Sequence, residues 1–384
     1  MAQSFIVVAH NQKAHNHTQL LRIKLPKNNY KAEVWDKHEK KFVGSHDFDI
    51  LEQIHFQKED QTFTDYEMFI DHDLEANEVG FIRVSKTDGK QSLAALANTT
   101  SKTLLEISGF TEDNEALFKF TNKEQEFQQS FGVTLKYWKA KQVKNDKDGG
   151  PEGFAEGAYI MAPVGWHSEK YSKIDPDITY EQGKTVEQWT IKFADKSTQQ
   201  YAVLKVRYSP SFNELIEFDV ELSPVPVDND KQGKDVTVNW RMYDGFEANK
   251  TFWTDSNGLE MQERRINWRP TFTVDAKQNI SSNFYPVASA VAMRDFSKNS
   301  GRAVVVVNDR TQAGSAEIHK STIELVQNRR LIQDDIRGVE EPLNEVDKDN
   351  NGLKVNARYY MHIFDRTKAQ SRQREAEINV NQPV

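Results

Sequence analysis

The sequence predicts an all-β protein. Its 384 residues contain many short runs in which apolar and polar residues alternate, which is the period of a strand with one buried face. Polar turn residues separate these runs, and a single stretch, residues 124–131, fits a short helix. So many strands without intervening helices predict antiparallel β-sandwiches and argue against an α/β fold.

The first 95 residues are predicted to form a small antiparallel β-sandwich. Six short strands joined by polar turns are typical of such a domain. The strand-like runs are residues 4–9, 20–25, 30–35, 50–56, 66–70 and 79–84. Residues 86–102 are polar and rich in small side chains, so we place the domain boundary there and take the first domain as residues 1–95.

Residues 96–384 are predicted to form a second, larger β-domain. Its main strand-like runs are residues 104–108, 115–121, 132–138, 186–193, 200–208, 215–222, 235–241, 288–293, 303–307, 318–326 and 354–364. No internal repeat is evident. The number of long strands indicates a large sandwich.

One strand of this domain shows its alternation clearly. The run ELIEFDVEL places Ile216, Phe218 and Val220 on one face. Glu217 and Asp219 point to the opposite face. This pattern is typical of a half-buried antiparallel strand, so we expect the charged face to lie in water.

Composition and charge argue against several classes of protein. The net charge of −8 argues against nucleic-acid binding, which needs a basic surface. No apolar run has the length that spans a bilayer, and the N-terminus lacks the basic and apolar regions of a signal peptide. Aromatic residues make up 11% of the chain, which argues against disorder. Since the chain has no cysteine, disulfides do not indicate its compartment.

Five charges fall within nine positions near the end of an apolar run: Arg329, Arg330, Asp334, Asp335 and Arg337. Charge clusters usually form solvated surfaces. The mixed signs and the interleaved apolar residues favour a different arrangement, a partly buried ion-pair network that fixes a corner of the large sandwich. The residues alone leave both interpretations open.

Several blocks of the sequence resemble a known enzyme family. The blocks are RRLIQDDIRGVEEPLNE, FWTDSNGLEMQERRINWRPTF at 252–272, NFYPVASAVAMRD at 283–295 and VNDRTQAGSAE at 307–317, with EGAYIMAP and ELSPVPV before them in the right order. They are similar to blocks in the C-terminal half of glycoside hydrolase family 38, the lysosomal-type α-mannosidases. The resemblance covers most of the chain from about residue 100 to about residue 360, and residues 1–95 resemble the family's preceding small β-domain more weakly.

The resemblance implies a fold and an activity. In this family a small sandwich and a large β-supersandwich similar to galactose mutarotase follow a three-helix bundle. Residues 96–384 are therefore expected to form that supersandwich without its C-terminal end. The whole enzyme is implied to be a retaining glycosidase that hydrolyses terminal α-linked mannose. It uses zinc and two carboxylates, all held in an N-terminal α/β domain.

This chain is expected to lack that catalytic domain. It has no His-x-Asp zinc motif, and its nearest approximations, His46-Asp47-Phe48-Asp49 and Asp71-His72-Asp73, lie in the small sandwich, where the family has no metal role. We therefore expect no catalytic residue, metal site or cofactor in this chain, and no activity when it is alone. The expected partners are the N-terminal catalytic domain and a mannose-containing glycan. The implied location is lysosomal or vacuolar, or secreted, although lysosomal members usually carry disulfides and this chain has no cysteine.

One segment is expected to contact sugar. In the family, an arginine after the Asp-Ser-Asn-Gly stretch is thought to reach the substrate pocket. The matching residues here are Arg264 and Arg265, which follow Asp255. A guanidinium group can hold two adjacent sugar hydroxyls. The alternative is that both arginines pair with Asp255 or Glu260 across a hairpin.

The surface around these arginines is expected to be bare when the catalytic half is absent. Trp253, Trp268 and Arg264 would then form a partly apolar patch, the kind that marks a missing partner. A tryptophan in such a patch has a ring that can stack on a sugar.

Residues 347–358, DKDNNGLKVNAR, imitate a calcium-binding loop. The twelfth position should be a bidentate glutamate and is Arg358, so a tight turn between strands is the expected structure.

Two other functions remain open. The chain is compatible with a free-standing carbohydrate-binding module, which glycan binding by the isolated chain would favour. It is also compatible with a structural interaction domain, which a protein partner without sugar binding would favour.

Overall fold

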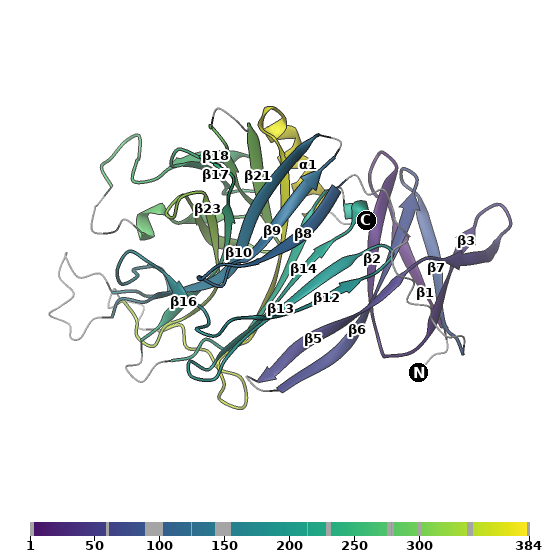
Figure 1. The fold of residues 1–384 in the computed structure, drawn as a ribbon, viewed down its shortest axis with the longest axis horizontal. Helices are drawn as coiled ribbons and strands as arrows, with labels where there is room; N and C mark the ends of the chain where they lie inside the picture. Colours follow the sequence, from purple (N-terminus) through teal and green to yellow (C-terminus); the bar gives the residue numbers. More distant parts are fainter. Residues whose placement is uncertain are drawn as a thin grey trace.

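In the computed structural model of the protein, the structure describes residues 4–58, 61–88, 103–123, 125–142, 155–212, 214–227, 232–274, 278, 280–297, 301–335 and 341–381. In this part of the chain the secondary structure is almost entirely antiparallel strand (Figure 1). A small sandwich precedes a large one, so the predicted all-β fold is confirmed. No helix among these residues is long and apolar enough to cross a membrane.

The N-terminal sandwich consists of two sheets. One has the strand order β1-β7-β3-β4 and the other β2-β6-β5. The strands are β1 Ser4–His10, β2 His17–Leu25, β3 Tyr30–Asp36, β4 Lys41–His46, β5 Asp49–Lys58, β6 Gln61–Leu74 and β7 Val79–Lys86. Its core lies between the sheets, where Ala32 and Ile82 of the first sheet pack against Met68 and Ile70 of the second.

All six strands predicted for this domain are present. β4 was missed, since it is short and contains Gly44, whose φ of 70° is a conformation that favours glycine. The predicted domain boundary at residue 95 lies outside the described residues, so the exact division stays a prediction.

The C-terminal sandwich pairs an 8-stranded sheet with a 9-stranded sheet. The first contains, in spatial order, β19 Tyr285–Val287, β22 Gln312–Ala316, β23 Thr322–Arg330, β16 Lys234–Met242, β10 Phe127–Lys139, β9 Ala116–Asn122 and β8 Thr103–Phe110, with β11 Glu169–Lys170 beside β10. The second contains β12 Asp177–Gln182, β13 Glu187–Asp195, β14 Gln200–Tyr208, β15 Ile216–Leu222, β24 Val355–Asp365, β21 Arg302–Asn308, β20 Ala290–Arg294, β17 Thr251–Asp255 and β18 Met261–Arg265. Phe118, Phe131, Phe218, Trp240 and Tyr359 are fully buried in the core between the two sheets.

The helix predicted for residues 124–131 is wrong. Residues from Phe127 onwards belong to β10, which pairs with β9 on one side and β16 on the other. Pairing on both edges and burial of Phe131 in the core outweigh the weak helical preference of this segment. Residue 124 itself lies outside the described residues.

A helix that the sequence analysis did not predict, α1 Ala369–Asn381, follows the last strand. It packs Ala369 and Ala376 on the outer face of the 9-stranded sheet, against Ala303, Val305 and Phe364. The helix therefore covers one part of that face.

The N-terminal sandwich covers another part of the same face, and the contact is rich in charge. Arg22 donates to Glu217 at 2.8 Å and to Glu67 at 3.0 Å. Arg207 donates to Glu217 at 2.5 Å and to Asp219 at 3.3 Å. We call these five residues the interdomain polar layer. Arg22 and Glu67 come from β2 and β6, and the other three come from β14 and β15.

The interdomain polar layer overturns one expectation. Glu217 and Asp219 were expected in water, and they are 0% and 6% exposed. The alternation along β15 is as predicted, because Ile216, Phe218 and Val220 lie in the main core. The opposite face is dry because β2, β6 and β5 lie on it, which no local pattern within β15 reveals.

Candidate functional site

Asp255, one of the residues expected to contact sugar, is buried at the end of β17, where the turn to β18 begins. One carboxylate oxygen accepts the backbone N–H groups of Asn257 at 2.9 Å and Gly258 at 2.6 Å. The other oxygen accepts the hydroxyl of Ser289. With 1% of its surface exposed, Asp255 holds the turn in shape.

The two arginines that follow have different surroundings. Arg264 donates to the hydroxyls of Thr254 at 3.0 Å and Ser256 at 2.8 Å, and its guanidinium carbon lies 4.5 Å from the centre of the Tyr285 ring. Arg265 pairs with Glu263 at 2.9 Å. Among the described residues, neither arginine pairs with Asp255 or Glu260, so the predicted alternative for them is wrong.

The predicted patch around these arginines is only partly exposed. Trp268 is 50% exposed and lies under the guanidinium of Arg265 at 5.1 Å. Trp253 is 7% exposed, because it packs against Ala290 and Ala292 and lies under Arg294 at 4.1 Å. Trp253 is therefore not part of the exposed patch. Contact of this hairpin with sugar stays a prediction.

A second group of charged residues surrounds Arg329 at the end of β23. Its guanidinium donates to Asp235 at 2.7 Å, to Glu156 at 2.9 Å and to the carbonyl oxygens of Ala158 and Gly157 at 3.1 and 3.2 Å. Both carboxylates have fully buried side chains, while the side chain of Arg329 is 20% exposed. We call Arg329, Asp235 and Glu156 the arginine corner.

The arginine corner holds two acids and one base in a dry environment. Burial, and then the proximity of Asp235, raise the pKa of Glu156 to about 10. The raised pKa favours the neutral form of Glu156 in this site. A neutral carboxyl group costs less to bury than a charged one, and the guanidinium of Arg329 donates to both acids.

The other residues of the predicted five-residue network have separate surroundings. Arg330 donates to the side-chain oxygen of Asn344 at 2.8 Å and to the carbonyl oxygen of Val225 at 2.9 Å. Asp335 is 7% exposed, and Asp334 is partly exposed. Arg337 lies outside the described residues. The ion-pair partners of Arg329 come from β16 and from the segment before β11, and neither partner is one of the five predicted charges. Pairing among the five charges themselves stays a prediction.

The two zinc-like motifs of the small sandwich have structural contacts. Asp49 accepts the backbone N–H groups of Lys184, Thr185 and Val186 at 2.6, 2.6 and 3.0 Å. His46 bonds to the carbonyl oxygen of Asp71. Across the described ranges, no group of three or more histidine or acidic side chains is arranged to hold a metal ion.

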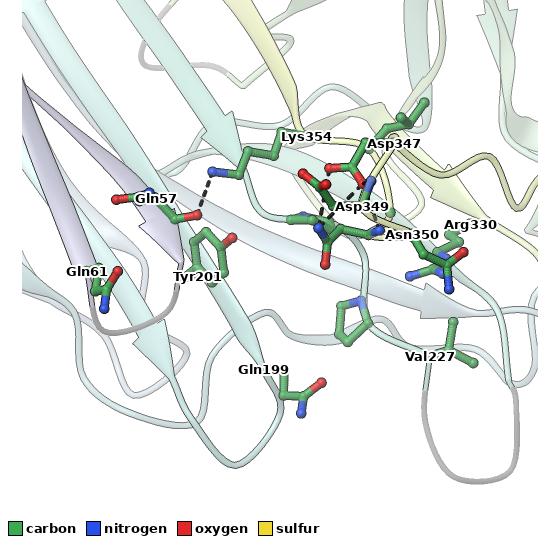
Figure 2. Close-up of a pocket in the computed structure, with 15 residues that line it drawn as sticks. Gln57, Gln61, Gln199, Tyr201, Val227, Arg330, Asp347, Asp349, Asn350 and Lys354 are labelled. Atoms are coloured by element: carbon green, nitrogen blue, oxygen red, sulfur yellow. Dashed lines mark hydrogen bonds between the residues drawn. The ribbon is translucent and has the colours of Figure 1, made fainter.

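A groove lies where the two sandwiches meet (Figure 2). It encloses about 1020 Å³ and is open to solvent. It is lined by Gln57, Gln61, Gln199, Tyr201, Pro224, Pro226, Val227, Arg330, Asp347, Asp349, Asn350, Asn351, Gly352, Leu353 and Lys354. Lys354 ties the two domains together there, because its ammonium group donates to the carbonyl oxygens of Phe56 and Gln57 at 2.7 and 2.9 Å.

Half of the groove's polar side chains are free to bind a ligand. Gln57, Gln61, Gln199, Asp349 and Asn350 have exposed side chains that bond to no other described residue. Amide and carboxylate groups both exchange hydrogen bonds with hydroxyl groups. The groove is therefore chemically suited to a polyhydroxylated molecule.

The calcium-like loop forms one wall of this groove. Asp347 accepts the backbone N–H groups of Asp349 and Asn351, both at 2.9 Å. The predicted tight turn is therefore present, and the carboxylate of Asp347 stabilises it by accepting these two hydrogen bonds. The groove itself is not predictable from local sequence patterns, because its residues come from five separate segments of the chain.

The fold and these sites define a protein of two stacked β-sandwiches, with a buried charged contact between them and a polar groove at their junction. Residues 112–337 match the model of the glycosyl hydrolases family 38 C-terminal domain. Since this match covers more than half of the chain, the protein belongs to glycosyl hydrolase family 38.

Individual relatives support this family assignment. The chain is 36% identical over 169 residues to the lysosomal alpha-mannosidase of Bos taurus, covering 44% of this chain and 16% of that protein. It is 30% identical over 236 residues to the lysosomal alpha-mannosidase of Homo sapiens, covering 62% of this chain and 21% of that protein. These matches span about a fifth of the relatives' length.

A solved structure shares the fold. The crystal structure of a protein in glycosyl hydrolase family 38 from Enterococcus faecalis superposes with a TM-score of 0.59 at 11% identity. The superposition covers 98% of this chain and 47% of that one. At this identity the similarity establishes the fold alone.

Proposed function

We propose that this chain is the C-terminal β-sandwich portion of an α-mannosidase, an enzyme that hydrolyses terminal α-linked mannose from glycans. The observation that carries the proposal is the family match over residues 112–337, together with the named lysosomal alpha-mannosidases among its relatives. The same names support a lysosomal or vacuolar location for the enzyme.

The proposal assigns the reaction to a partner domain. Among the described residues, no group of three or more histidine or acidic side chains is arranged to hold a metal ion. We infer that zinc and the catalytic carboxylates belong to an N-terminal α/β domain, and that this chain supports that domain. Arg264 and Arg265, on the β17–β18 hairpin, are the residues proposed to approach the substrate.

The test is a reconstitution experiment. The purified chain, supplied with zinc, is expected not to cleave an aryl α-mannoside, whereas a mixture with the catalytic half of the enzyme is expected to cleave it. The catalytic half alone is the control. Turnover by the isolated chain that a chelator abolishes would overturn the assignment of the reaction to a partner.

The groove at the junction of the sandwiches favours a second candidate function, that of a carbohydrate-binding module. Its unpaired amide and carboxylate side chains supply the observation. A glycan array probed with the isolated chain tests this candidate. Binding that Asp349→Ala and Asn350→Ala both abolish would support it, and the absence of any bound glycan would leave the first proposal alone.

A further inference from the structure

A second pocket lies on the outer face of the 8-stranded sheet, beside the neighbouring strands β10, β16 and β23. It encloses about 500 Å³, which is within the range of about 300–1,000 Å³ usual for small-molecule sites. It is lined by Asp113, Glu115, Lys136, His167, Ser168, Asn239, Arg241, Ile318, His319, Lys320 and Thr322. No function assigned above uses this pocket.

Three polar atoms in the wall of this pocket are buried without a hydrogen-bond partner: Asn239 Oδ1, Ser168 Oγ and His319 Nε2. Asn239 is 2% exposed, and its amide nitrogen donates to the hydroxyl of Thr237 at 2.8 Å, which fixes the orientation of the amide. Buried polar groups are nearly always satisfied in folded proteins. Three unsatisfied atoms on residues that line one pocket leave hydrogen-bonding capacity that a bound molecule or ordered water would satisfy.

The histidine is held in place by stacking. The ring of His319 lies parallel to Trp138, with ring centres 5.9 Å apart, and to His167, with ring centres 6.0 Å apart. Burial, and then the nearby Lys136 and His167, lower the pKa of His319 to about 4. The ring is therefore neutral, so it offers one hydrogen-bond donor and one acceptor.

The charges around the pocket have both signs. Asp113 and Glu115 are acidic, and Lys136, Arg241 and Lys320 are basic. A simple anion would face the two carboxylates, and a simple cation would face the three bases. A neutral molecule with several hydroxyl groups meets neither difficulty, because each hydroxyl both donates and accepts.

We propose that this pocket binds a neutral polyhydroxylated ligand of the size of one sugar residue, with Asn239, Ser168 and His319 as hydrogen-bond partners at its wall and Arg241 as a further donor. The proposal does not rest on hydrolysis of mannose by the assembled enzyme, so the two can fail separately. It assigns a binding role to a sheet face that the sequence analysis left without one.

The test measures binding of methyl α-mannoside, methyl α-glucoside and methyl α-galactoside to the full chain by saturation-transfer NMR and calorimetry. Saturable binding of at least one glycoside is expected. Ser168→Ala removes one proposed hydrogen bond to the ligand, and Ser168 lies outside the strands. This variant should weaken binding about fivefold, the equivalent of about 1 kcal/mol. Arg241→Gln, on an exposed side chain, should also weaken it. Thermal unfolding of each variant checks that the fold is intact.

Ser371→Ala, on the exposed side of α1 and outside both cavities, is the matched control and should leave this binding unchanged. Three results would overturn the proposal. The first is no saturable binding of any of the three glycosides, which would mean that ordered water fills the pocket. The second is displacement of the glycoside by inorganic phosphate, which would identify an anion site. The third is binding that survives both pocket variants.

Discussion

The interdomain polar layer and the β17–β18 hairpin both contain an arginine paired with a carboxylate at short distance. Arg207 lies 2.5 Å from Glu217 with side chains 1% and 0% exposed, while Arg265 lies 2.9 Å from Glu263 with side chains 52% and 47% exposed. The distances are similar, but a buried charge that loses its partner is left without water, whereas an exposed one is rehydrated. Burial, more than geometry, therefore sets what each pair contributes.

The largest effect is expected in the interdomain polar layer. Arg207→Ala removes the hydrogen bonds to Glu217 and Asp219 and leaves Asp219 only the longer ion pairs with Arg358 at 3.7 Å and Arg22 at 3.9 Å. Removing one partner of a buried pair costs about 3–5 kcal/mol. Urea denaturation of the variant against the parent chain measures the loss. A loss below about 1 kcal/mol, the range of surface pairs, would show that water enters the contact between the two sandwiches and that the comparison does not hold.

The second prediction concerns packing at the arginine corner. A Cβ atom on Gly157 would lie 2.6 Å from Cβ of Asp335 and 2.9 Å from its backbone nitrogen. Overpacking of this kind costs about 1–3 kcal/mol. We therefore expect Gly157→Ala to lower the urea concentration at the midpoint of unfolding. Gly245→Ala cannot serve as the control, because the φ of Gly245 is 76° and any side chain there would be strained. An unchanged midpoint would indicate that the segment carrying Gly157 moves freely against Asp335.

The sequence predicts the fold well because local alternation survives in the strands that form the core. The run 200–208 was predicted with the bounds that β14 has. Strands β12, β17 and β18 were missed because they are short and carry polar residues on both faces. Helix α1 was missed because it has no clear apolar stripe, and only Ala369, Gln373, Ala376 and Glu377 are buried.

The sites are less predictable than the fold, because burial by another domain leaves no local pattern. Glu217 and Asp219 alternate with apolar residues as an exposed face would, yet the N-terminal sandwich covers them. The family resemblance directed attention to Arg329, but its partners Asp235 and Glu156 lie 94 and 173 residues away. Such long-range pairs follow from the topology of the sheets.

The third prediction uses the pH dependence of the arginine corner. The pKa of Glu156 is raised in the folded state, from 4.5 to about 10, so this group stabilises the fold fully below its unfolded pKa and loses that contribution as the pH rises toward 10. Glu156→Gln imitates the protonated form. The difference in unfolding free energy between about pH 5 and about pH 9 should then shrink by at least about 1.4 kcal/mol, the equivalent of one pKa unit.

Urea denaturation of Glu156→Gln and the parent chain at both pH values measures this difference. Glu263→Gln serves as the control, because Glu263 belongs to an exposed pair and its replacement should leave the pH dependence unchanged. Equal pH dependence in parent and Glu156→Gln would mean that Glu156 is ionised in the folded protein.

The smallest effect is expected at the hairpin. Arg265→Ala removes an exposed ion pair with Glu263 and a cation–π contact with Trp268, and such surface contacts contribute about 0–1 kcal/mol. Added salt should reduce even this difference, since exposed charges are screened. If the isolated chain keeps its stability but the reconstituted enzyme loses turnover, Arg265 acts on the substrate side, as proposed. If stability falls by more than about 2 kcal/mol, beyond what a surface pair supplies, the hairpin is packed against a surface in solution. The contrast with the interdomain polar layer would then be smaller than the exposed fractions indicate.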